Sequence, residues 1–337
     1  MRSVRLLTFA LLAAIMAISP AIAQTTVRFA SVGGLTDAGL YLAEELGAFK
    51  AANLTVTLKR MANAPDLVTA LATDQLDVGG IAITPGMFAA VQQGINIKIV
   101  GDKQSFRPGF AATRLVARAE LAKGSGADTI KSLKGKTFAV SARASSSFYN
   151  IVQLLRENGM SLDDIKVAQL AYPQMLPALA SGAVDAAYII EPFLSQSVRD
   201  KVAVDIGNVG DLNKSGAAWV SVPIVYSEKF AGNKAAAQAF MTAYVKGVRA
   251  YNDALVKGVD KDRVFDIIAK RAGLDRATVE TTNPAGLDPN QDISLDSLKE
   301  MQQFFIEQKL LAAPTDLAKL VDLSFAKAAV TDLGVYK

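Results

Sequence analysis

Cysteine and histidine are both missing from the 337-residue sequence. Without cysteine, the chain can form no disulfide, no thiolate metal site, no cysteine nucleophile and no lipid anchor on an N-terminal cysteine. Without histidine, it lacks the commonest general base and metal ligand, and with them a Ser-His-Asp triad. Carboxylates remain as acid-base groups, but no local motif marks a pair of them. We therefore expect no catalytic residue, no metal and no cofactor.

A strong charge of either sign is also missing. The sequence has 36 basic and 32 acidic residues, and the basic residues are dispersed rather than clustered. A nucleic-acid-binding face needs a clustered basic stripe, so we expect no nucleic acid partner. With 51% hydrophobic and 20% charged residues, the composition is that of a globular protein.

Long hydrophobic runs occur only at the N-terminus. Arg2 and Arg5 precede an apolar run over residues 6–18, and Ala21 and Ala23 form a small-x-small site before Gln24. This pattern is typical of a secretory signal peptide, so we predict cleavage after Ala23 and exclude residues 1–23 from the fold. No later run reaches the roughly 18 apolar residues of a membrane helix, and we expect a soluble periplasmic protein.

Residues 136–159 predict a strand, a serine-rich turn and a helix that ends near Gly159. The turn contains Ser145, Ser146 and Ser147 at the positive end of that helix, where N–H groups and hydroxyls can hold an anionic or strongly polar group. The alternative is an ordinary serine N-cap on a surface helix. Residues 26–48 predict the same order of strand, polar turn and helix.

A second pair of segments repeats at nearly the same spacing. Residues 70–78 (ALATDQLDV) are echoed by residues 178–186 (ALASGAVDA) 108 positions later, and the two opening strands lie 110 positions apart. Repeats of solenoids are roughly 20 to 50 residues long, so this longer spacing predicts two similar α/β lobes. A ligand would lie between them.

The order of predicted elements gives the fold class and the domain division. Strands over 54–58, 77–83 and 95–100 alternate with helices, which predicts in each lobe a mostly parallel sheet flanked by helices. We predict residues 24–115 as the first part of lobe 1, 116–221 as lobe 2, and 222–337 as the helical second part of lobe 1. The extended runs 114–118 and 217–226 would connect the lobes as a two-segment hinge.

Several segments together carry a family resemblance. They are residues 42–50 followed by 54–56, then 70–78, 132–137, 178–186, 191–193 and 317–322. In order and spacing these resemble the periplasmic substrate-binding proteins of ABC importers, in the branch of the sulfonate, taurine, nitrate and thiamine-pyrimidine binders. The resemblance implies a type II-like two-lobed fold, a small-molecule ligand and transient docking on an inner-membrane permease. We expect a monomer.

The resemblance also implies where the ligand binds. Family members use the loop after the first strand, the loop after the strand at Asp77, the serine-rich turn and the segment around residue 191. The matching positions in this sequence are Gly33, Gly34, Thr36, Asp37, Thr84, Pro85, Arg143, Ser145, Ser146, Ser147, Glu191 and Phe193.

Five residues deserve separate weighing. Arg107 and Arg143 could each offer a planar fork to a carboxylate or sulfonate, beside an aromatic wall at Phe106. Glu191 would favour an amine or pyrimidine if it faced the cleft, or it could pair with the neighbouring lobe and carry no ligand information. Trp219, the single tryptophan, could stack on a ligand or pack at the hinge.

Two segments partly match known binding motifs, a phosphate loop and a calcium loop, but each lacks residues that its motif requires. Gly135, Lys136 and Thr137 look like the end of a phosphate loop, but they enter a strand rather than a helix. Residues 288–299 have calcium-loop spacing, but Ile293 and Lys299 replace the turn glycine and the bidentate glutamate, so a polar loop capping a helix at Asp296 is the plain alternative.

The sequence therefore predicts a binding protein for a small organic anion, a sulfonate or carboxylate held at the serine-rich turn. The first alternative is a pyrimidine or other heterocycle read by Glu191 and aromatic residues. An enzyme on the same fold, and a sensory protein that docks on a receptor, are the other two.

Overall fold

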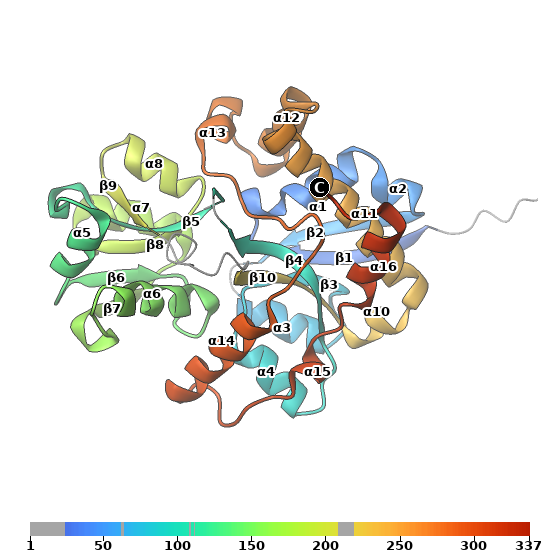
Figure 1. The fold of residues 1–337 in the computed structure, drawn as a ribbon, viewed down its shortest axis with the longest axis horizontal. Coiled ribbons are helices and arrows are strands. Elements are labelled where there is room, and N and C mark those ends of the chain that lie inside the picture. Colours follow the sequence, from blue (N-terminus) through green and yellow to red (C-terminus); the bar gives the residue numbers. More distant parts are fainter. Residues whose placement is uncertain (1–23, 62–63, 108, 111, 208–218) are drawn as a thin grey trace, which may run out of the picture.

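A computed structural model describes residues 24–337 except 62–63, 108, 111 and 208–218. The predicted signal peptide, residues 1–23, lies outside the described residues. Two lobes lie side by side, each built on a five-stranded sheet (Figure 1). In the described part of the chain, no helix is long and apolar enough to span a membrane.

The two sheets have the same topology. The first has the order β2-β1-β3-β10-β4 and the second has the order β7-β6-β8-β5-β9. In each sheet one strand, β10 or β5, runs antiparallel to the other four, which confirms the prediction of mostly parallel sheets. The strands are β1 (Thr25–Ser31), β2 (Leu54–Arg60), β3 (Val78–Gly80), β4 (Lys98–Phe106), β5 (Thr113–Arg118), β6 (Thr137–Val140), β7 (Lys166–Gln169), β8 (Ala186–Ile190), β9 (Ala203–Gly207) and β10 (Trp219–Tyr226).

The internal repeat is confirmed at the level of single hydrogen bonds. The N–H of Asp77 donates to the Arg28 carbonyl, and the Asp77 carboxylate accepts from the Arg28 N–H at 2.8 Å. Asp185 makes the same pair of bonds with Thr137, the second at 2.9 Å. The same pair of hydrogen bonds therefore joins β1 to the start of β3 in the first sheet and β6 to the start of β8 in the second.

The chain changes sheets at places that differ from the prediction. Residues 114–118 and 219–226 are not free connectors but strands, β5 inside the second sheet and β10 inside the first. The predicted boundaries at 115/116 and 221/222 therefore cut through strands. Both runs are apolar because neighbouring strands flank them on two sides. We propose that the lobe boundaries lie before β5 and before β10.

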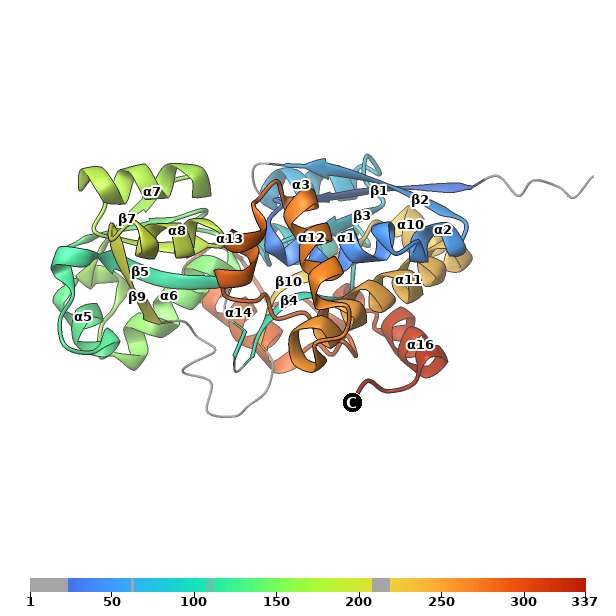
Figure 2. The same ribbon diagram turned by 90° about the horizontal axis from the view of Figure 1, so that it is seen from above.

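Helices cover both faces of each sheet (Figures 1 and 2). With the first sheet lie η1 (Leu35–Asp37), α1 (Ala38–Glu45), α2 (Ala48–Ala51), α3 (Ala64–Ala72), α4 (Pro85–Gln92), α10 (Glu228–Gly232), α11 (Lys234–Asn252), the π-helical η4 (Asp253–Lys257), α12 (Lys261–Ala272), α13 (Arg276–Thr281), α14 (Leu295–Glu307), α15 (Leu317–Leu320) and α16 (Ser324–Leu333). With the second lie η2 (Ala119–Leu121), α5 (Gly126–Ser132), α6 (Ser146–Glu157), η3 (Leu162–Asp164), α7 (Tyr172–Ser181) and α8 (Phe193–Arg199).

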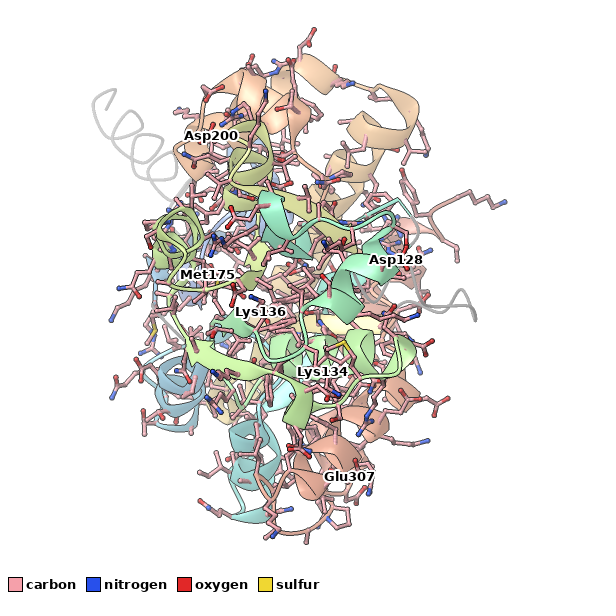
Figure 3. All side chains as sticks on the ribbon, turned by 90° about the vertical axis from the view of Figure 1, so that its left-hand side faces the viewer. Asp128, Lys134, Lys136, Met175, Asp200 and Glu307 are labelled. Carbon is pink, nitrogen blue, oxygen red and sulfur yellow. The ribbon has the colours of Figure 1, made fainter. Side chains whose placement is uncertain are left out.

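Helix α14 contacts both lobes, so the prediction that the C-terminal helices pack on the first lobe alone is wrong for this helix. Phe305 packs edge-on against Phe88 of α4, with ring centroids 6.1 Å apart, whereas Phe304 packs against Tyr149 of α6 at 5.4 Å. At the end of the helix, Glu307 lies near α6 of the second lobe (Figure 3). Two successive phenylalanines thus face one helix of each lobe.

The start of α14 also differs from the prediction in detail. The helix begins at Leu295, and its N-cap is Ser294, whose hydroxyl accepts the Ser297 N–H at 3.2 Å. Asp296 lies in the first turn instead of capping it. A serine hydroxyl can accept an N–H group of the first turn as a carboxylate can, so Ser294, two residues before Asp296, can cap the helix.

Candidate ligand-binding site

A cavity lies between the two sheets, near the ends of β1, β3, β6 and β8. Its volume is about 60 Å³, which is room for roughly four to six water-sized groups. The first sheet and its loops contribute Val32, Gly33, Thr36, Ala64, Gly80, Ala82, Lys103, Gln104, Ser221 and Val222. The second contributes Thr113, Ser141, Ala142, Ser145, Ser147, Tyr172 and Ile190.

Lys103 supplies the charge of this cavity. Its Nζ lies 2.8 Å from an Asp37 carboxylate oxygen and donates to the Thr36 hydroxyl at 2.7 Å. The Lys103 side chain is 1% exposed and that of Asp37 is fully buried. An ammonium has three N–H donors, and these contacts use two, which leaves one for a ligand. Among the described lining residues, Lys103 is the single lysine, arginine, aspartate or glutamate.

The local backbone explains how this buried pair forms. Gly33 and Gly34 have φ of 88° and 92°, and this turn delivers Thr36 and Asp37 to the end of β1. Asp37 also accepts from the Ser31 hydroxyl at 2.6 Å. On β3, a Cβ at Gly80 would lie 2.3 Å from Lys103 Cδ, so the stem of the lysine can cross the strand there only because residue 80 is glycine.

The second lobe contributes neutral hydroxyls. Ser145 caps α6, because its Oγ accepts the Phe148 N–H at 3.4 Å while donating to the Ala142 carbonyl at 2.8 Å. The Ser141 hydroxyl donates to Tyr172 Oη at 3.1 Å, and Ser147 Oγ lies 3.5 Å from the same atom. Donors therefore gather at the positive end of a twelve-residue helix.

One carboxylate near this site has a perturbed pKa. Asp102 precedes Lys103 on β4 and is fully buried. Burial, reinforced by the nearby charge of Asp288, raises the pKa of Asp102 to about 8. Its carboxylate accepts the Asp288 N–H at 2.8 Å.

With this geometry established, the chain can be compared with known proteins. A family model described as NMT1/THI5 like matches residues 36–254. The chain belongs to the NMT1/THI5-like family. It is 27% identical, over 87% of its length and 85% of the relative, to a protein of Bacillus subtilis named a putative aliphatic sulfonates-binding protein.

Solved structures share the fold of this NMT1/THI5-like chain. The periplasmic aliphatic sulphonate binding protein SsuA from Escherichia coli matches with a TM-score of 0.66 and 21% identity, over 87% of this chain and 91% of the other. The desulfurization enzyme DszB, solved as a cysteine-to-serine mutant with biphenyl-2-sulfinic acid, matches with a TM-score of 0.63 and 17% identity, over 92% and 99%. Both binding proteins and an enzyme therefore use this fold.

Four of the residues predicted for the site line the cavity of this NMT1/THI5-like chain: Gly33, Thr36, Ser145 and Ser147. Asp37 lies directly behind it as the partner of Lys103. Gly34 faces the other lobe, where a Cβ would lie 3.7 Å from the Glu191 carbonyl oxygen.

Ser146 and Glu191 connect the lobes instead of facing the cavity. Ser146 donates from its hydroxyl to the Ser221 carbonyl at 3.0 Å and is fully buried. The Glu191 carboxylate accepts from the N–H and hydroxyl of Ser195, and from the N–H and side-chain amide of Asn283, at 2.8 to 3.0 Å. Two interpretations of Glu191 were open, and the structure agrees with the one in which this carboxylate pairs with the neighbouring lobe.

Neither predicted arginine lines the cavity. Arg107 lies 3.6 Å from Asp288 and over the ring of Phe110. Arg143 is exposed and donates to the Val167 carbonyl. Each guanidinium lies close to an acceptor that is distant in the sequence, Asp288 for Arg107 and the Val167 carbonyl for Arg143.

The remaining predicted residues have structural positions. Thr84 and Pro85 form the cap and first residue of α4. Phe106 lies in the core, and Phe193 packs on the core of the second lobe. Trp219 lies beside Tyr149, with ring centroids 6.0 Å apart, so it packs at the lobe junction rather than on a ligand.

The sequence reasoning missed Gly80, Lys103, Gln104, Thr113, Ser141 and Tyr172. A usable signal was present for one pair. The double glycine of β3, Gly79 and Gly80, is unusual inside a strand, and the stem of Lys103 occupies the place where a Cβ at residue 80 would lie.

Proposed function

We propose that this chain is the solute-binding component of an ABC importer and captures a small organic anion, a sulfonate or a carboxylate, for delivery to a membrane permease. The observation that carries the proposal is Lys103, the single basic or acidic side chain among the described residues of a cavity that both lobes line. An anion entering there meets a desolvated cation and several hydroxyl donors, which strengthens each charge-assisted hydrogen bond.

Cellular location and oligomeric state follow from the same proposal. The predicted signal peptide and the name of the Escherichia coli structure, a periplasmic protein, support a periplasmic location. We propose a monomer that docks transiently on its permease, with a small-molecule ligand as its only other partner.

We propose binding without turnover. The enzyme with this fold was solved as a cysteine-to-serine mutant, whereas the present sequence contains neither cysteine nor histidine. Lys103 is held in an ion pair, and the described lining residues offer no carboxylate to act with it as a second acid-base group.

The heterocycle alternative has lost its support. Glu191 is committed to Ser195 and Asn283, and Trp219 packs on Tyr149. Tyr172 is the one aromatic side chain among the described lining residues. A pyrimidine would therefore lack the sandwich and the carboxylate on which that interpretation depended.

A titration calorimetry panel on the chain beginning at Gln24, unfolded and refolded to remove bound ligand, tests the proposal. We expect binding of short sulfonates or carboxylates, no binding of pyrimidines, and unchanged ligand after overnight incubation. The double substitution Lys103→Met with Asp37→Asn should weaken binding at least about 100-fold, or about 2.7 kcal/mol, without leaving a buried charge unpaired.

Lys50→Met, an exposed lysine on α2, is the matched control and should bind normally. Binding of heterocycles alone, or undiminished anion binding by the double variant, would contradict the proposal. Accumulation of a product would favour the enzyme instead.

A further inference from the structure

We propose that the ligand carries no ammonium group, so that the site selects amine-free two-carbon anions such as isethionate and ethanesulfonate over the amino analogue taurine. This inference rests on the proposed function and specifies the class of ligand within it. It depends on which charges can reach the cavity.

The positive charge of Lys103 already occupies the cavity. A ligand with a sulfonate at one end and an ammonium at the other would satisfy the lysine with its first group. In a cavity of about 60 Å³, a two-carbon chain is short enough that its second group lies close to the charge of Lys103. An ammonium there needs a carboxylate, because an unpaired buried cation is strongly disfavoured.

The carboxylates near the cavity, those of Asp37, Asp102 and Glu191, belong to residues that do not line it. Asp37 binds Lys103 and accepts from the Ser31 hydroxyl at 2.6 Å. Glu191 accepts four hydrogen bonds from Ser195 and Asn283. No aspartate or glutamate is among the described residues that line the cavity.

The polar groups opposite Lys103 suit a neutral partner. Ser141, Ser147 and Tyr172 bring three hydroxyls together on the second lobe, and Gln104 donates to the Thr113 hydroxyl at 3.1 Å across the lobes. A hydroxyl both donates and accepts, so this group can bind a ligand hydroxyl in either direction. It carries no negative charge with which to neutralise an ammonium.

Matched ligands test the inference directly. Ethanesulfonate, isethionate and taurine share one sulfonate and one two-carbon chain, and end in a methyl, a hydroxyl and an ammonium. Propionate, 3-hydroxypropionate and β-alanine form the corresponding carboxylate set. Calorimetry at pH 7 on the refolded chain from Gln24 should give the tightest binding for a hydroxyl member, a methyl member within about tenfold, and the ammonium member at least 100-fold weaker.

An ammonium member that binds within tenfold of its hydroxyl analogue would overturn the inference and leave the proposed function standing. Absence of binding by every member of both sets would overturn the proposed function, and the inference with it. The two failures are therefore distinguishable in one experiment.

A charge-introducing variant gives a second readout. Gln104→Glu places a carboxylate against the cavity, where the Thr113 hydroxyl, which accepts from Gln104 in the wild type, can instead donate to it. We expect at least tenfold tighter taurine binding and at least tenfold weaker isethionate binding. Gln303→Glu, on the exposed face of α14, makes the same chemical change away from the cavity and should alter neither. A Gln104→Glu protein that melts normally and keeps the wild-type order of ligands would contradict the inference.

Discussion

The two lobes share one sheet topology but differ in the side chains that they bring to the cavity. The equivalent strands β3 and β8 show one such difference. Val78 of β3 pairs with Phe29 in the first sheet, as Ala186 of β8 pairs with Phe138 in the second. Two residues later the first lobe has Gly80, and the second has the fully buried Tyr188. The glycine leaves room for the stem of Lys103, whereas the tyrosine fills the corresponding space and accepts from Asn150 at 3.1 Å.

The same division extends to the edge of the cavity. The first lobe brings a buried ion pair, Lys103 with Asp37, and the second brings uncharged hydroxyls at the start of α6. The bonds that both lobes keep are those of Asp77 and Asp185, which hold strands together. The repeat thus preserves what stabilises a sheet, and the cavity in which we propose that the ligand binds lies where the copies differ.

The largest expected effect is a pH dependence of the free energy of unfolding, and it arises in the first lobe. Burial raises the pKa of Asp102 in the first lobe to about 8, well above its usual value of 3.8. Its folded form therefore holds a proton more tightly, and stability should be highest at low pH and fall from about pH 4 until it levels off above about pH 8, by at most about 1.4 kcal/mol per pH unit. Urea unfolding across pH 5 to 9 measures this slope.

Asp102→Asn should flatten that slope. Asp205 on β9, the corresponding edge strand of the second lobe, is exposed and pairs with Arg114, so Asp205→Asn should leave the slope in place. A slope that survives in Asp102→Asn would show that another group is responsible.

A methyl group on β3 should give the next largest effect. Gly80→Ala brings a Cβ to 2.3 Å from Lys103 Cδ and 2.5 Å from Cε. The lysine must move, so we expect anion binding to weaken by about 2 kcal/mol, roughly 30-fold, as measured by calorimetry. Gly232→Ala, with no atom within 4 Å of the new Cβ, serves as control. Equal affinities in the two variants would remove Lys103 from the site.

The smallest effect belongs to the second lobe. Tyr172→Phe removes one neutral hydroxyl, so binding should weaken by about 1 kcal/mol. Tyr336→Phe, which loses its bond to Asp253 far from the cavity, should leave ligand affinity unchanged. A loss from Tyr172→Phe that exceeds the loss from Gly80→Ala would invert the comparison between the lobes.

The fold could be predicted from the sequence because its determinants are local and occur twice. Asp74 and Gly182, at equivalent positions of the two echoed segments, both have left-handed backbones after their helices, with φ of 53° and 75°. Such turns, and the apolar runs around them, can be predicted from each short segment of the sequence by itself.

The role that we propose for Lys103 could not be predicted from the sequence, because it depends on the ion pair with Asp37, which lies 66 positions away. The segment Gly101-Asp102-Lys103-Gln104 looks like a polar turn, so the predicted strand ended at residue 100, whereas β4 continues to Phe106. Ser145 and Ser147, which line the cavity, could be proposed from the sequence because a helix start is a local feature. Arg143 and Glu191 do not line it, because Arg143 bonds to Val167 and Glu191 bonds to Ser195 and Asn283, and the sequence alone does not reveal these partners.

The close packing at the junction of the lobes has an optical consequence. Ser147 at the cavity is followed immediately by Phe148 and Tyr149, which contact Phe304 of α14. The indole of Trp219, the only tryptophan in the sequence, lies beside Tyr149. If α6 moves when a ligand leaves the proposed site, the surroundings of this indole change, so the emission of the unlabelled protein should report that movement.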